Sequence, residues 1–131
     1  MTYQSVIVTV RAHDRRIKPH EAEGFVPFAT CPLAVMPAHE FDSHEEWKAK
    51  RNEWVITHRP TGFYLGGKLT SREVAERVLN AAQPNFPGWL MANGYEGDLA
   101  TIACRAVYRA ALIANGIEVP ETVEPQVVCD D

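Results

Sequence analysis

The stretch from His39 to Glu46, which reads HEFDSHEE, brings two histidines together with four carboxylates. Imidazole and carboxylate groups bind metal ions and also act as general acids and bases. His39 and His44 stand five positions apart, however, whereas zinc-protease histidines stand about four apart on one helix face. Ser43 is also a good residue to begin a helix between them. The stretch therefore predicts a solvated helix start, with a metal site as the alternative.

A second candidate for chemistry is His58, which ends a predicted strand and precedes a turn. An imidazole can activate a cysteine thiol as a nucleophile, and Cys31 is the cysteine considered for this role. No local motif joins the two residues, and a histidine at a turn usually has a structural role. We therefore expect no catalytic, metal-binding or cofactor-binding residue, and no cofactor. An enzyme with a histidine-centred site around His39, His44 or His58 remains the third hypothesis.

Residues 62–71 read GFYLGGKLTS and nearly match the phosphate-binding loop, in which Gly-Lys is followed by Ser or Thr. Leu69 occupies the position of that hydroxyl residue, and leucine cannot bind a magnesium ion. The bulky residues 63–65 would also stand where the loop backbone must approach phosphate. We therefore predict a β-hairpin with its turn at residues 59–62, and no nucleotide site.

Two small groups of basic residues are suited to contact the phosphates of a nucleic acid. One group begins at the end of the first predicted strand and comprises Arg11, Arg15, Arg16 and Lys18. The other is the pair Arg105 and Arg109, which stand one helical turn apart. The whole chain has 13 Lys and Arg against 17 Asp and Glu, which gives a formal net charge of −4. Because this acidic balance disfavours a general nucleic-acid binder, a DNA-binding regulator is the second hypothesis.

Aromatic residues offer a further possibility, which is the anchoring of a protein partner. Tryptophan and tyrosine are enriched where protein interfaces gain most of their binding energy. Trp47 falls in a charged segment and Trp89 follows a Pro-Gly pair, so these two are the candidates for exposure and for partner binding, and Tyr64 and Tyr95 could join them. The alternative is that each of these rings belongs to the core.

Periodicity and proline placement predict a small α+β domain that holds these side chains. Alternating apolar residues favour strands, and a proline-broken apolar stretch favours an edge strand or two short extended pieces. The strands are expected at residues 5–11, 53–58 and 63–69, the proline-broken stretch at 25–38 with 33–36 best ordered, and a loop at 12–24. We predict an antiparallel sheet of three or four strands packed against two main helices.

Charge order and capping residues predict where the helices lie. Residues 43–52 carry acidic side chains first and basic ones last, which suits the helix dipole. Thr70 and Glu73 form a capping box for a helix over residues 71–82. The longest helix is predicted over 99–115, with Gly116 as its left-handed C-cap. Its apolar stripe is expected to comprise Leu99, Ile102, Ala103, Ala106, Ala110 and Ile113.

The chain of 131 residues has the length of a single compact domain. Its last residues, from about 118 to 131, are acidic and broken by prolines, so we expect them to be extended or partly disordered. The three cysteines are odd in number and far apart, which points to a reducing compartment. No segment reaches the length of a membrane span, and we expect a cytoplasmic protein with no membrane partner.

The segment Glu53–Ala82 contains a Trp-Val-Ile-Thr-His-Arg-Pro-Thr-Gly hairpin followed by a capped helix. It resembles a unit found in many small accessory proteins of bacteria, phages and other mobile elements. It also looks faintly like the hairpin–helix of the arm-binding domains of phage integrases. The resemblance covers about a quarter of the chain and implies an α+β structural unit more than any one activity.

The leading hypothesis is a small non-enzymatic protein that binds a macromolecular partner, either a protein or a protein–nucleic-acid complex. One form of it is a phage or mobile-element inhibitor of a host defence system, comparable to an anti-CRISPR protein. The DNA-binding regulator and the histidine-centred enzyme are the two alternatives.

Overall fold

The computed structural model describes residues 2–12, 16–41, 46–83, 89 and 99–117 of the chain. Five strands are followed by two helices: β1 (Gln4–Val10), β2 (His20–Val26), β3 (Leu33–Phe41), β4 (Trp47–His58), β5 (Phe63–Leu69), α1 (Arg72–Ala82) and α2 (Leu99–Ala114). The α+β class and the two helices are confirmed. The expected count of three or four strands is wrong, because the described sheet has five.

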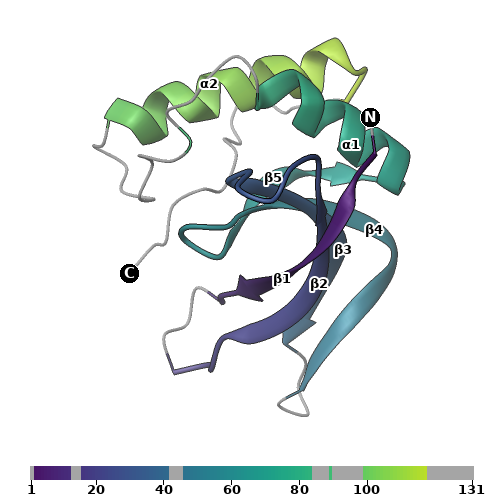
Figure 1. Cartoon of the computed structure of the whole chain (residues 1–131), viewed down its shortest axis with the longest axis vertical. Helices are drawn as coiled ribbons and strands as arrows, with labels where there is room; N and C mark the ends of the chain where they lie inside the picture. The colour runs from purple at the N-terminus through teal and green to yellow at the C-terminus, as the bar shows by residue number, and fades with distance from the viewer. Residues whose placement is uncertain (1, 13–15, 42–45, 84–88, 90–98, 118–131) are drawn as a thin grey trace.

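The sheet is an antiparallel meander in which each strand pairs with the next along the chain. Figure 1 shows that it is strongly curled. The curl brings the two edge strands together at one point, where the Arg11 N–H donates to the carbonyl of Gly62 at 2.9 Å. Gly62 has a φ of +80°, and a Cβ there would stand 2.8 Å from the carbonyl oxygen of Thr9. Only glycine fits this contact without strain.

Strand β2 replaces part of the loop expected over residues 12–24. The alternation in His20–Val26 explains it, since Glu21 and Glu23 are exposed while Gly24 and Val26 are buried. In the sequence, Gly24 suggests the end of a loop, but it lies within β2. Glycine is favoured there because a Cβ would lie 2.7 Å from a methyl group of Val8.

The first half of β4 contradicts the helix predicted over residues 43–52. Residues 47–52 belong to β4, and its first three residues pair with β3, as in the Glu40–Lys48 and Phe41–Trp47 partners. Lys50, one of the basic residues that suggest a helix, lies 3.5 Å from Glu40 on the neighbouring strand and forms a cross-strand ion pair with it. The register shifts between Pro37 and His39, and Asn52, with a φ of +59°, lies in this irregular part of β4.

Strand β3 is a central strand and not the expected edge strand, because it pairs with both β2 and β4. Leu33–Met36 are fully buried, as the best-ordered part of the proline-broken stretch. Pro37 is accommodated next to the register shift, where the regular ladder is interrupted.

The hairpin predicted in place of a phosphate-binding loop is confirmed. β4 and β5 pair antiparallel from Ile56–Leu65 to His58–Phe63, and residues 59–62 form the turn between them. A register shift separates the Trp54–Leu69 pair from the Ile56–Leu65 pair, so the ladder between β4 and β5 is irregular within β5.

Helix α1 contacts strands β3, β4 and β5, and α2 contacts α1. Figure 1 shows both helices on the same side of the curled sheet. The core contains residues of the sheet and of both helices, including Val8, Ile56, Leu79 and Tyr108. Within the described residues, no helix is both long enough and apolar enough to cross a membrane.

Candidate functional site

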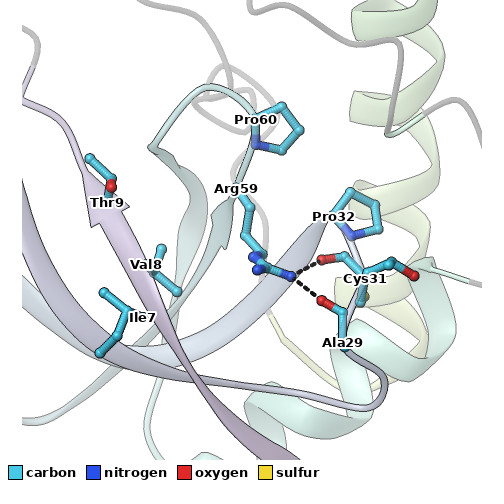
Figure 2. A pocket seen from close by; sticks show the side chains of 9 residues that line it. Ile7, Val8, Thr9, Ala29, Cys31, Pro32, Arg59 and Pro60 are labelled. Atoms are coloured by element: carbon cyan, nitrogen blue, oxygen red, sulfur yellow. Dashed lines mark hydrogen bonds between the residues drawn. The ribbon is translucent and has the colours of Figure 1, made fainter.

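An open groove with a volume of about 520 Å³ lies beside the edge strand β1. Three consecutive β1 residues form one wall, and the β2–β3 connection and the β4–β5 turn form the other; the lining is Ile7, Val8, Thr9, Ala29, Thr30, Cys31, Pro32, Arg59 and Pro60. Figure 2 shows Arg59 between β1 and the Ala29–Pro32 segment. The groove therefore joins segments that are far apart in the sequence.

Arg59 places a guanidinium group in the lining of the groove. Its Nη1 donates to the carbonyl oxygens of Ala29 and Cys31, both at 2.8 Å (Figure 2). Its backbone N–H also donates to the carbonyl of Pro32 at 2.7 Å. These bonds fix the guanidinium group and hold the β2–β3 connection against the β4–β5 turn. The groove thus has a positive charge in a defined position.

Exposed apolar side chains concentrate at this groove. Among the described residues, the large apolar side chains with high exposure are Ile7 at 65%, Ile113 at 58% and Phe28 at 44%. Ile7 lines the groove, and Phe28 directly precedes the lining residue Ala29. An exposed apolar side chain next to a groove is typical of a binding surface.

The sequence interpretation missed this site, although it contained one signal for it. Ile7 shares the outer face of β1 with Thr9 and Arg11, where an apolar side chain is out of place on a polar strand face. Arg59 gave no signal, because its neighbours in the groove come from the β2–β3 connection and depend on how the sheet curls.

His58 is fully buried and has structural partners for both ring nitrogens. Nε2 lies 2.7 Å from the carbonyl oxygen of Trp89, which can only accept, so Nε2 carries the hydrogen. Nδ1 lies 2.9 Å from the Thr61 hydroxyl and accepts from it. Burial is the main cause that lowers the pKa of His58, which keeps it neutral. This arrangement ties the β4–β5 turn to Trp89 and leaves no nitrogen for catalysis.

The thiol–imidazole pair considered for catalysis gains no support from these contacts. Cys31 is buried, and burial is the main cause that raises the pKa of its thiol. A buried thiol with a raised pKa is a poor nucleophile. Cys104 is also buried and is in no disulfide with a described residue, and Cys129 lies outside the described residues.

Trp47 belongs to a half-buried cluster at the opposite end of β4 from the groove. Its ring stacks on His20, with centroids 5.4 Å apart, and contacts Phe41 edge-on at 5.7 Å. His20 also contacts the His39 ring at 5.4 Å. Trp47 is therefore partly exposed, but its Nε1 is already bonded to the Lys18 carbonyl at 3.2 Å.

His39 and His20 do not form a complete metal site with described residues. Nδ1 of His39 lies 2.8 Å from the Pro37 carbonyl, which fixes its ring. In the part of the chain that the structure describes, no three His, Cys, Asp or Glu side chains are grouped to hold a metal ion. His44, the other histidine of the HEFDSHEE stretch, lies outside that part.

The expected exposure of Trp89 is wrong. Its side chain is fully buried, and its ring lies 5.9 Å from that of His58. Tyr64 is half-buried and anchored, because its hydroxyl donates to the His39 carbonyl at 2.6 Å and accepts from the His39 N–H at 2.7 Å. Burial raises the pKa of Tyr64 to about 12. Tyr95 lies outside the described residues, so the four aromatic candidates do not form one surface here.

The basic candidates are divided between two separate places. Arg11, Arg16 and Lys18 are exposed at or after the end of β1, whereas Arg105 and Arg109 are half-buried on α2. Figure 1 shows that β1 begins near the helices and ends away from α2. Arg15 lies outside the described residues. The described basic residues therefore do not form one continuous patch.

Comparison of the chain with protein-family models, with curated proteins and with solved structures gave no significant match. The groove beside β1 must therefore be interpreted from its own geometry.

Proposed function

We propose that this protein is a small non-enzymatic module that acts by binding a protein partner through the groove beside β1. The observation that carries the proposal is the meeting of three features at one place. These features are the strand β1 at the edge of the described sheet, the exposed side chain of Ile7 and the fixed guanidinium group of Arg59. Main-chain groups, apolar area and one oriented charge together favour recognition of a protein.

The narrower form of the proposal is an inhibitor of a host defence system encoded by a phage or mobile element. It is supported by the resemblance of residues 53–82 to a unit in accessory proteins of such elements. The same segment supplies Arg59 and the turn that borders the groove. An inhibitor of this kind works by occupying a surface of its target, so it needs no catalytic group.

The test is an affinity capture from a lysate of the organism that encodes the chain, or of its host. The capture is performed with and without nuclease, and the retained proteins are identified by mass spectrometry. We expect one protein to be retained in near-stoichiometric amount, and to remain after nuclease treatment. Retention that disappears with nuclease would instead favour the DNA-binding regulator, whose binding should also fall steeply with salt. Absence of any retained protein would contradict the proposed function.

A further inference from the structure

We propose that the groove takes an extended segment of the partner protein, which adds to β1 as a further strand and pairs an Asp or Glu side chain with Arg59. This inference rests on the proposed function and specifies the chemistry of the partner. Three observations support it, and they concern the edge of β1, the two faces of that strand and the free donors of Arg59.

The hydrogen-bonding edge of β1 is open over Ser5 and Ile7. Arg11 directs its N–H away from β2, toward Gly62. Backbone groups in a strand alternate in direction, so Ser5 and Ile7, an even number of residues earlier, direct theirs to the same edge. In the described part of the chain, no backbone bond beyond the β1–β2 ladder is recorded for either residue. Their N–H and C=O groups are therefore available to an added strand.

Both ends of β1 are fixed, so this open edge is held in place. At its start, the Tyr3 hydroxyl donates to Oδ1 of Asn80 on α1 at 2.6 Å. At its end, Arg11 bonds to Gly62 at 2.9 Å. A strand that is already ordered loses little conformational entropy when it pairs with a partner.

The two faces of β1 require different side chains in an added strand. Residues directly opposite each other in a sheet point to the same face. The partner residue opposite Val8 would therefore point to the inner face, which borders the groove with Arg59 (Figure 2). The residue opposite Ile7 would lie on the outer face, next to the exposed Ile7 side chain and near Glu23, which pairs with Ile7.

Arg59 has donors left for a carboxylate. Both bonds of its Nη1 go to the Ala29 and Cys31 carbonyls. Within the described residues its Nε and Nη2 have no recorded partner. These two nitrogens form the side edge of the guanidinium group, which matches a carboxylate in a bidentate pair. Since Arg59 is half-buried, such a pair is screened less by water than a pair on the open surface.

These constraints define a sequence pattern. The partner segment should carry an acidic residue flanked on both sides by β-branched, aromatic or basic residues. A second acidic residue at a flanking position would approach Glu21 and Glu23, which are exposed on the outer face. The same two carboxylates disfavour a nucleic-acid backbone along β1.

The test is a selection of short random linear peptides, displayed as a library, on the immobilised full-length chain. We expect enriched peptides to contain the pattern of one acidic residue between β-forming neighbours. The affinity of a selected peptide should fall about tenfold or more with Arg59→Lys, because lysine keeps the positive charge but lacks the paired N–H donors of the guanidinium group. Exchange of the peptide's acidic residue for its amide should cause a similar loss. Enrichment without an acidic residue, or no enrichment at all, would overturn the proposal.

Ile7→Pro tests the strand pairing itself. Proline removes the Ile7 N–H from the open edge and leaves the β1–β2 ladder bonds in place, so folding is compatible with it. Binding of the selected peptide should be lost, whereas Ile7→Thr, which keeps the N–H, should weaken it by only a few fold. If Ile7→Pro does not fold, amide hydrogen exchange on the unaltered chain replaces it, and the Ile7 amide should become protected when the peptide is bound. Unchanged exchange at Ile7 would contradict strand addition.

The failure of this inference can be separated from the failure of the proposed function. If a nuclease-resistant protein partner is captured equally well by the unaltered chain, Arg59→Lys and Ile7→Thr, the chain binds a partner by another surface. A measurement of molecular mass in solution can show whether the chain forms a dimer. If it does, and Ile7→Pro abolishes the dimer, then a second copy of the chain and not a partner segment pairs with β1. In both cases the proposed strand addition is wrong.

Discussion

The end of β4 and the β4–β5 turn hold three residues with separate tasks. His58, the last residue of β4, bonds to the Trp89 carbonyl, Arg59 orients its charge in the groove, and Gly62 accepts the hydrogen bond from Arg11. The contacts that close the sheet and those that shape the groove are thus only a few residues apart. Changes in this turn should affect stability and binding in distinguishable ways.

Gly62→Ala should destabilise the fold more than the matched change Gly116→Ala. Both glycines have a left-handed backbone, with φ of +80° and +75°, and alanine in that conformation costs about 1–2 kcal/mol. At Gly62 the added methyl group would also stand 2.8 Å from the Thr9 carbonyl, whereas at Gly116 nothing lies within 4 Å. We expect a loss of about 3 kcal/mol at Gly62 and about 1 kcal/mol at Gly116. Urea denaturation of both variants measures the difference, and equal losses would contradict the close contact with β1.

His58→Gln should remove part of the pH dependence of stability. The pKa of His58 is lowered in the folded state, so below its ordinary value the unfolded chain binds the proton more readily. The contribution of His58 to the free energy of unfolding should therefore be constant above about pH 7 and decrease as pH falls below about 6.5. Glutamine retains an N–H donor for the Trp89 carbonyl but does not titrate. The slope below about pH 6.5 should be smaller in the variant; it will not vanish, since the pKa of His20 is also lowered.

Denaturant titrations of the unaltered chain and His58→Gln at several pH values measure these slopes. Identical slopes for the two proteins would show that His58 is not held neutral by burial.

At the scale of elements, the start of α1 differs by one residue from the capping box in the sequence. Ser71 and not Thr70 is the N-cap, because the Ser71 hydroxyl accepts from the Val74 N–H at 3.2 Å. Ser71→Ala should therefore reduce the free energy of unfolding by about 1 kcal/mol. Thr70→Ala is the matched control and should change it by less than about 0.5 kcal/mol. Thermal or denaturant unfolding measures both losses. A larger loss with Thr70→Ala than with Ser71→Ala would show that Thr70 is the N-cap.

Local signals in the sequence were sufficient for the hairpin and for the ends of α2. The Schellman-type ending of α2 is confirmed, with Gly116 left-handed and the Ile117 N–H bonded to the Leu112 carbonyl at 2.9 Å. The hairpin of β4 and β5 follows from its turn glycine and alternating residues. Each of these features depends on residues within one or two turns of chain.

Features that depend on distant residues were not predictable. Residues 43–52 have the charge order of a helix, but the segment from Trp47 pairs with β3, and Lys50 forms an ion pair with Glu40 on that strand. The apolar stripe proposed for α2 is wrong in part, because Ile113 is 58% exposed and the buried residues include Cys104, Tyr108 and Leu112. Helix periodicity alone could not choose the buried face, since α2 is rich in apolar residues on several sides. The groove was missed because its lining residues come from distant segments that only the curl of the sheet brings together.

At the scale of the whole molecule, the curl of the sheet creates the candidate site. It brings the end of β1 against the β4–β5 turn and the β2–β3 connection, although these segments are widely separated in the chain (Figures 1 and 2). Among the described residues, the backbone bond from the end of β1 to Gly62 has no counterpart at Ser5 or Ile7. Natural proteins usually protect the edge of a sheet, so an exposed isoleucine there favours a role in binding.

The most direct test of the account is quantitative capture of the nuclease-resistant partner by three full-length proteins: the unaltered chain, Ile7→Thr and Ile113→Thr. The two substitutions remove the same apolar surface at similarly exposed positions, one in the groove and one on α2. We predict that Ile7→Thr weakens partner binding several fold and that Ile113→Thr leaves it unchanged. Equal binding by all three proteins, or a loss confined to Ile113→Thr, would contradict the assignment of the partner site to the groove beside β1.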